Sequence, residues 1–123
     1  MRTTQRKGDI ATTRAIATFT SMGWDVSIPV TESAAYDLVV DDGAVLHRVQ
    51  CKYCGSARRQ VDLRQIHSNS GGYVVKLVPR DAYDWLYMLC SDGREYLVKE
   101  CLYGRSSVTL SPTYLLGVAA EPG

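Results

Sequence analysis

A short apolar stretch interrupted by an acidic turn constrains the fold of this chain most strongly. Residues 36–40 form a compact apolar run, Asp41-Asp42-Gly43 is typical of a hairpin turn, and residues 45–52 alternate between apolar and polar. The stretch therefore predicts two antiparallel strands joined by a tight turn. Because side chains alternate across a strand, one face of the second strand is expected to pack inward. That face carries Val45, Val49 and Cys51.

Three polar residues of this hairpin form a candidate functional cluster. Asp37 opens the first strand, while Gln50 and Lys52 close the second strand two residues apart. Since residues at i and i+2 share a face, the side chains of Gln50 and Lys52 leave the same side of the sheet. An acid, an amide and an amine are thereby expected beside one hairpin.

The rest of the chain predicts one helix followed by short strands. Apolar residues at helical spacing predict a helix over residues 7–22, ended by Gly23, and residues 24–30 alternate as a strand. Further strands are expected at residues 60–66, 73–78, 85–90, 95–98 and 106–110, with a polar mobile loop at 67–72 and a short helix or turn at 99–104. This order predicts an α/β or α+β fold with a mixed sheet, in a single domain of residues 1–123.

Positive charge is concentrated in two parts of a chain whose net charge is only +1. One part is the N-terminus, which includes Lys7, and the other lies between His47 and His67. A basic side of this kind suits a polyanion, although solvated surface charge is the alternative explanation. The basic residues of the second part are Arg48, Lys52, Arg58, Arg59 and Arg64.

The cysteines favour a reducing compartment. No apolar segment approaches the roughly 20 residues of a membrane span, and the N-terminus lacks the apolar core of a secretory signal. A cytoplasmic location is therefore expected, with the four cysteines as thiols. Cys51-x-x-Cys54 also allows a zinc-bound scaffold, but the chain has no second close pair, so buried thiols are favoured.

The order of helix, strand and polar hairpin resembles the PD-(D/E)xK nuclease superfamily. In that pattern an Asp ends one strand and Glu-x-Lys, or less often Gln-x-Lys, lies on the next, as Tyr36-Asp37 and Gln50-Cys51-Lys52 do here. The Lys7-Gly8-Asp9-Ile10 start of the helix resembles archaeal Holliday-junction resolvases. The stretch YDLVVDDG…RVQCK is similar to small endonucleases related to a cyanobacterial intron-encoded homing enzyme.

The resemblance implies a restriction-endonuclease-like core, a mixed β-sheet flanked by helices, and metal-dependent hydrolysis of DNA. Asp37 would bind Mg²⁺, or Mn²⁺ as a substitute, together with the backbone carbonyl of Cys51 and the amide oxygen of Gln50. Lys52 would orient water or stabilise the transition state. The implied partners are double-stranded or branched DNA and further copies of the chain, as a dimer or tetramer, in a prokaryotic or phage-encoded cytoplasmic protein. Contacts to DNA phosphates are expected from Lys7, Arg48, Arg58, Arg59 and Arg64.

Two positions depart from the superfamily pattern. Relatives carry a Glu on the first helix where this chain has Thr12, and Gln50 replaces the more common Glu. Glu32 is preferred over Asp9 as the acid that compensates, because a loop beside the site can bend its side chain inward. The leading hypothesis is a homing-endonuclease-like enzyme. The alternatives are a Holliday-junction resolvase and a catalytically weakened DNA-binding module.

Overall fold

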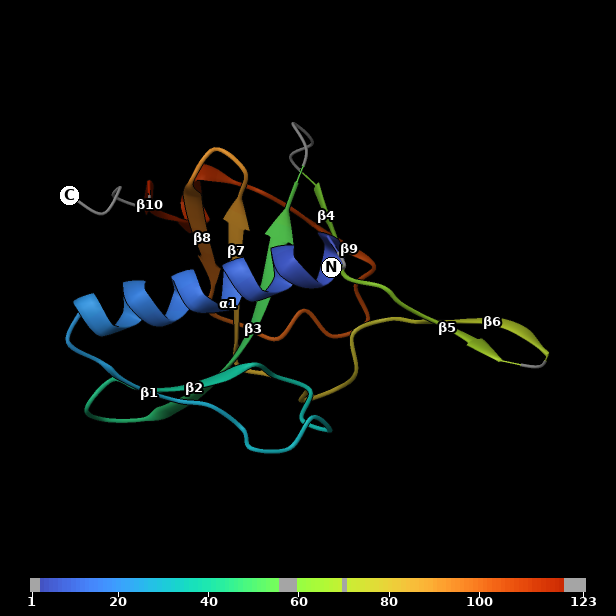
Figure 1. The fold of residues 1–123 in the computed structure, drawn as a ribbon, viewed down its shortest axis with the longest axis horizontal. Coiled ribbons are helices and arrows are strands. Elements are labelled where there is room, and N and C mark those ends of the chain that lie inside the picture. Colours follow the sequence, from blue (N-terminus) through green and yellow to red (C-terminus); the bar gives the residue numbers. More distant parts are fainter. Residues whose placement is uncertain (1–2, 56–59, 70, 119–123) are drawn as a thin grey trace.

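A six-stranded mixed sheet forms the centre of the fold (Figure 1). The structure, a computed structural model, describes residues 3–55, 60–69 and 71–118. The strand order is β1 (Asp25–Ser27), β2 (Leu38–Asp41), β3 (Leu46–Cys54), β7 (Trp85–Cys90), β8 (Arg94–Val98) and β10 (Leu115–Val118). Of these pairings, β3 with β7 is parallel and the others are antiparallel. One α-helix with a mixed sheet confirms the expected α+β class.

Two small sheets lie outside the central one. The first pairs β4 (Gln60–Asp62) with β9 (Ser107–Thr109), and the second pairs β5 (Gln65–Asn69) with β6 (Gly72–Lys76). Before β10, residues Pro112–Tyr114 form one turn of 3₁₀-helix. Within the described segments, no helix has the length and apolarity that a membrane span needs.

Helix α1 (Thr3–Ser21) covers one face of the sheet (Figure 1). Its residues Ala11, Ala15 and Phe19 are fully buried in one core with β-strand residues such as Val49 and Tyr87. Spacing of four residues puts the three on one helical stripe, which explains why this face docks on the sheet. The helix begins four residues before the expected start. The sequence did not predict this first turn, because residues 3–6 are polar and carry no apolar periodicity.

The helix ends as its sequence predicts. Gly23 has a φ of +86°, a conformation that L residues with a side chain rarely adopt. Its N–H donates to the Thr20 carbonyl, and the Trp24 N–H donates to the Phe19 carbonyl at 3.2 Å. The rings of Phe19 and Trp24 stack with centroids 5.8 Å apart. This C-cap turns the chain directly into β1.

The opposite face of the sheet is covered by strands and loops in the described residues. Leu86, Met88 and Val98 are buried there in a second core, to which β4, β9 and their flanking residues contribute. Strand β7 is buried on both faces, as expected for a central strand with a parallel neighbour.

A buried carboxylate ties α1 to the sheet. Glu95 of β8 is 4% exposed and accepts hydrogen bonds from the Tyr87 hydroxyl, at 2.6 Å, and from the Thr18 hydroxyl. Burial and the nearby Glu95 carboxylate raise the pKa of Tyr87. The three residues come from three different elements, so the network fixes how the helix lies across β7 and β8.

Three expectations from the sequence are wrong in detail. Val45 is 56% exposed, because it belongs to the turn and β3 begins only at Leu46. The strand expected over residues 24–30 is shorter, since only Asp25–Ser27 pair with β2. The loop expected at 67–72 belongs largely to the hairpin of β5 and β6. Of the short helix or turn expected at residues 99–104, the structure has the turn. The second hairpin of the central sheet, β7 with β8, is confirmed.

Candidate active site

Asp37 lies where β2 separates from β3. Its backbone N–H donates to the Val49 carbonyl at 2.8 Å, and its carboxylate accepts the N–H of Cys51 at 2.8 Å. The side chain therefore takes a place on the hydrogen-bonding edge of β3 that a continuing β2 would have used. One carboxylate oxygen is held against β3, and the residue stands immediately before the first paired residue of β2, Leu38.

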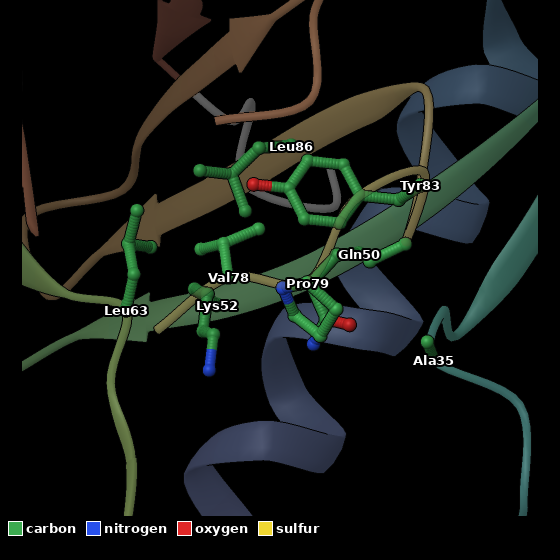
Figure 2. Close-up of a pocket in the computed structure, with 9 residues that line it drawn as sticks. Ala35, Gln50, Lys52, Leu63, Val78, Pro79, Tyr83 and Leu86 are labelled. Atoms are coloured by element: carbon green, nitrogen blue, oxygen red, sulfur yellow. The ribbon is translucent and has the colours of Figure 1, made fainter. Parts of the chain in front are cut away.

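Gln50 and Lys52 project from β3 into a small pocket (Figure 2). We call this hollow the Lys52 pocket. Its other walls are mainly apolar and come from the segment before β2, from the crossover between β3 and β7, and from β7 itself. They are formed by Ala35, Leu63, Val78, Pro79, Ala82, Tyr83 and Leu86. The amide of Gln50 also contacts the Cys51 carbonyl, with Nε2 at 3.4 Å from the oxygen.

A second hollow, the helix-side groove, lies between α1 and the segment that precedes β2. Asp9 and Thr12 line it from the helix, Glu32 from the loop, and Asp37 from the edge of the sheet. Thr12, the residue at the position where relatives carry a Glu, therefore shares a groove with Asp37. The groove also brings together the two acids considered from the sequence as replacements for the missing carboxylate.

The electrostatics of the site are dominated by burial. Burial raises the pKa of Asp37, while the hydrogen bond from Cys51 and the charge of Lys52 act in the opposite direction. Burial, followed by the charge of Asp37, also raises the pKa of the Cys51 thiol, against a hydrogen bond with Thr12 that lowers it. Cys51 is thus a protonated thiol at neutral pH, and its part in the site rests on its backbone groups.

The cysteine spacing does not create a shared metal site. Cys51 is buried in the core under α1, whereas Cys54 is buried in the core on the opposite face of the sheet. Residues three apart on a strand point to opposite sides, so the two sulfurs cannot bind one ion. Cys54 instead lies opposite Cys90 on β7, and burial together with Cys54 raises the pKa of Cys90 to about 12.

The donor atoms beside Asp37 suit a hard divalent cation. A carboxylate, a backbone carbonyl at Cys51 and the amide of Gln50 are all oxygen donors, which Mg²⁺ prefers. In the part of the chain that the structure describes, no three Asp, Glu, His or Cys side chains converge to hold a metal by themselves. The residues present therefore fit such an ion by chemistry, with Asp37 as the carboxylate that is hydrogen-bonded to Cys51.

The basic residues expected to contact DNA have different surroundings. The Nζ of Lys7 is 5.8 Å from the centre of the Tyr53 ring, at the end of β3. Arg64 is exposed and pairs with Asp62 at 3.0 Å. Arg58 and Arg59 lie outside the described residues.

Arg48 is engaged within the protein. Its guanidinium contacts Asp81 at 2.6 Å and Asp84 at 3.0 Å, and its backbone N–H also donates to Asp84. These contacts hold the segment that leads into β7. Asp81 and Asp84 lie more than thirty residues away in sequence, so no local pattern indicated the pairing.

The sequence also gave no sign of Tyr83 and Pro79 as walls of the Lys52 pocket. Both arrive through the crossover between β3 and β7, a non-local connection. His47 is both packed and hydrogen-bonded: its ring stacks on Trp85 with centroids 3.9 Å apart, and its Nε2 contacts the Asp42 carboxylate at 2.8 Å.

Two comparisons with known proteins find relatives. The family model of the PD-(D/E)XK endonucleases matches residues 2–111. Among solved structures, the chain is similar to I-Ssp6803I, a bacterial homing endonuclease, with a TM-score of 0.74 and 28% sequence identity over 89% of this chain and 79% of that chain. No curated protein sequence matches the chain. The matches agree with the expected restriction-endonuclease-like fold.

The raised pKa of Asp37 predicts that this residue destabilises the fold at neutral pH. A carboxyl whose pKa is higher in the folded state binds its proton more tightly there, so stability falls as the pH rises from the unfolded value of 3.8 through the folded value. Asp37→Asn keeps an oxygen to accept the Cys51 N–H and removes the buried charge. We expect the variant to have a higher Tm than the wild type at pH 7, with the difference disappearing in acid.

Thermal unfolding from pH 4 to pH 8 in the presence of a chelator measures this difference. Asp25→Asn, at an exposed acid of β1, controls for the loss of one negative charge. A lower Tm for Asp37→Asn at pH 7 would contradict the prediction.

Proposed function

Because the chain belongs to the PD-(D/E)XK endonuclease family, we propose that it is a divalent-metal-dependent DNA endonuclease that acts in the manner of homing endonucleases. The observation that carries the proposal is the 2.8 Å contact between the Asp37 carboxylate and the Cys51 N–H. It holds an acid next to the carbonyl of Cys51 and beside the strand segment from which Gln50 and Lys52 project.

We assign Mg²⁺, with Mn²⁺ as a substitute, to the oxygen donors of this strand edge. Asp37, the Cys51 carbonyl and the Gln50 amide would hold the ion, with Glu32 reaching it from the helix-side groove. When bound, the ion supplies Lewis acidity to the scissile phosphate and lowers the pKa of a bound water. The support is the chemistry of the donors, all of them oxygens of the kind that Mg²⁺ prefers.

Lys52 is assigned to the negative charge that develops on the phosphate. The side chain is half-buried, and its pocket is walled by Leu63, Pro79 and Leu86. An ammonium group in a poorly hydrated pocket stabilises a nearby anion more strongly than one in open water. The apolar walls therefore serve the chemistry by limiting the access of water to Lys52.

The small number of carboxylates favours a second candidate, a DNA-binding module with weakened catalysis. Thr12 offers a hydroxyl where relatives offer a Glu, so metal affinity depends on Asp37 and on an exposed Glu32. Junction resolution is a further possibility within the nucleases. The experiments below include a substrate for each.

Basic residues are proposed to contact DNA phosphates outside the site. Lys7 and Arg64 are exposed, which suits this role, and Arg58 and Arg59 remain part of the proposal. For Arg48 we propose a structural role, since its guanidinium already pairs with two carboxylates. A domain of this size covers little DNA, so we also propose that the protein acts as a homo-oligomer, a dimer or a tetramer, with paired sites. We further propose that it is a cytoplasmic protein.

Substitutions in the hairpin test the catalytic assignment. Lys52→Ala and Asp37→Ala are each expected to slow cleavage of supercoiled plasmid at least about 100-fold in Mg²⁺ or Mn²⁺, because Lys52 would stabilise the developing negative charge and Asp37 would hold the metal ion. Lys99→Ala, at an exposed lysine that directly follows β8, should cleave like the wild type. Gel electrophoresis of plasmid and of a four-way junction measures the rates.

The pattern of cleavage also separates the candidates. Preferred cutting of the four-way junction would support a resolvase, and DNA binding without any cutting by the wild type would support the weakened module. Cleavage that persists in both hairpin variants would contradict the site assignment.

Restoring an acid on α1 tests the assigned metal site without relying on activity. Thr12→Glu adds a carboxylate to the groove that Asp37 lines, so we expect Mn²⁺ to bind at least about tenfold more tightly, since ligand charge sets affinity for such ions. Isothermal titration with Mn²⁺ measures the dissociation constant. Thr20→Glu, at an exposed position near the far end of α1, should leave it unchanged. Equal affinities of the wild type and Thr12→Glu would place the metal elsewhere.

A further inference from the structure

The hairpin of β5 and β6, which we call the arm, extends away from the rest of the fold (Figure 1). Its strands Gln65–Asn69 and Gly72–Lys76 pair only with each other, and the arm packs on no other element among the described residues. A two-stranded hairpin alone is only marginally stable in water. An element held out in this way is therefore suited to a contact with something outside the chain.

The arm is rooted in the candidate active site. Leu63 precedes β5 and Val78 follows β6, and both line the Lys52 pocket (Figure 2). Backbone hydrogen bonds fix both roots: the Leu63 N–H donates to Ser106, and the Val78 N–H donates to Arg105. A nucleic acid whose phosphate reaches Lys52 must therefore pass the base of the arm.

The charge of the arm and of the residues on either side of it suits DNA. Between Asp62 and Asp81 the chain carries Arg64, Lys76 and Arg80 and no acidic residue, whereas the whole chain is close to neutral at +1. Lys76 and Arg80 are exposed. Such a stretch meets no electrostatic penalty on approaching a polyanion.

The shape and composition of the arm suit the major groove. This groove admits a two-stranded β-ribbon and is about 8.5 Å deep. A five-residue strand reaches about 16 Å at about 3.3 Å per residue, so the arm is long enough to reach the groove floor. The sequence of β5 is Gln-Ile-His-Ser-Asn, rich in residue types that hydrogen-bond to base edges.

A second copy of the chain is the less suitable partner. A stable interface between copies buries about 800 Å² on each side and has an apolar centre. The exposed apolar side chains described on and beside β6 are Val75 and Leu77, at 53% and 46% exposure. Two such side chains on a narrow ribbon with many polar residues provide little of that area.

We propose that the arm enters the major groove of duplex DNA and reads base sequence next to the phosphate that Lys52 contacts. The inference rests on the proposed function and deepens it. It divides recognition between two parts of the chain: the hairpin of β2 and β3 acts on the backbone at any sequence, and the arm chooses the sequence.

Shortening the arm tests the proposal. Residues 66–75 are replaced by Asn-Gly, a two-residue turn that can join the paired residues Gln65 and Lys76. Because the arm packs on no other element, the shortened protein should keep the wild-type fold, which circular dichroism and thermal unfolding verify. Lys76→Glu provides a point variant in the arm, with Lys99→Glu as its matched control outside it.

The readout is binding-site selection from a pool of random-sequence duplex DNA in Ca²⁺. We expect the wild type to enrich a sequence motif, and its preference for that motif over the unselected pool to fall at least about tenfold in the shortened protein, since each base pair read contributes about that much. Binding of both proteins to the unselected pool should be similar. Lys76→Glu should weaken binding to DNA, and Lys99→Glu should not.

Two outcomes would overturn the inference while leaving the proposed function intact. One is enrichment of the same motif with the same strength by the shortened protein. The other is a lower oligomeric state of the shortened protein than of the wild type in sedimentation velocity, which would make the arm an interface between copies. A wild type that neither binds nor cleaves duplex DNA would instead overturn the proposed function itself.

Discussion

The hydrogen bond from the Cys51 N–H to the Asp37 carboxylate determines where β2 leaves β3. The Asp37 side chain accepts a hydrogen bond at the edge of β3 in place of a backbone carbonyl. Strand β3 continues beyond this point to Cys54, whereas the segment before β2 turns away from it. Both hollows of the site result from this separation, one on the helix side and one around Lys52. The geometry of the sheet edge and the proposed chemistry of the site therefore depend on one carboxylate, whose raised pKa reflects its burial.

Local patterns in the sequence predicted the elements that local physics determines. Gly23 ended the helix because only a residue without Cβ adopts its φ of +86° without strain, and Asp41-Asp42-Gly43 marked the turn, in which Gly43 has a φ of +94°. The polar residues of the hairpin were identified from the same alternation. The burial of Val45 was wrongly predicted, because alternation does not indicate where a strand begins.

Non-local features were not predictable in the same way. The parallel pairing of β3 with β7 and the contribution of Tyr83 to the Lys52 pocket depend on a long crossover. The strand β6 was expected, but most of β5 was expected as a loop, because residues 67–72 are rich in small polar residues and show no alternation. Arg48 was assigned to DNA from its basic neighbourhood, and its pairing with Asp81 and Asp84 became visible only in the folded chain.

The helix-side groove explains how a chain without the usual helix carboxylate can still be considered an enzyme. Thr12 lies in the groove with Asp9 and Glu32, so side-chain oxygens from α1 and from the loop before β2 line the same groove as Asp37. Such an arrangement places a smaller negative charge around an ion than a site with two or three carboxylates. Weaker metal binding is the expected physical consequence.

Anomalous diffraction from crystals grown with Mn²⁺ tests the central claim most directly, because it locates the metal without reference to activity. The account predicts a peak within coordination distance of the Asp37 carboxylate and the Cys51 carbonyl, which disappears in Asp37→Ala. A peak away from Asp37, or no peak there when the crystals are saturated with Mn²⁺, would contradict it.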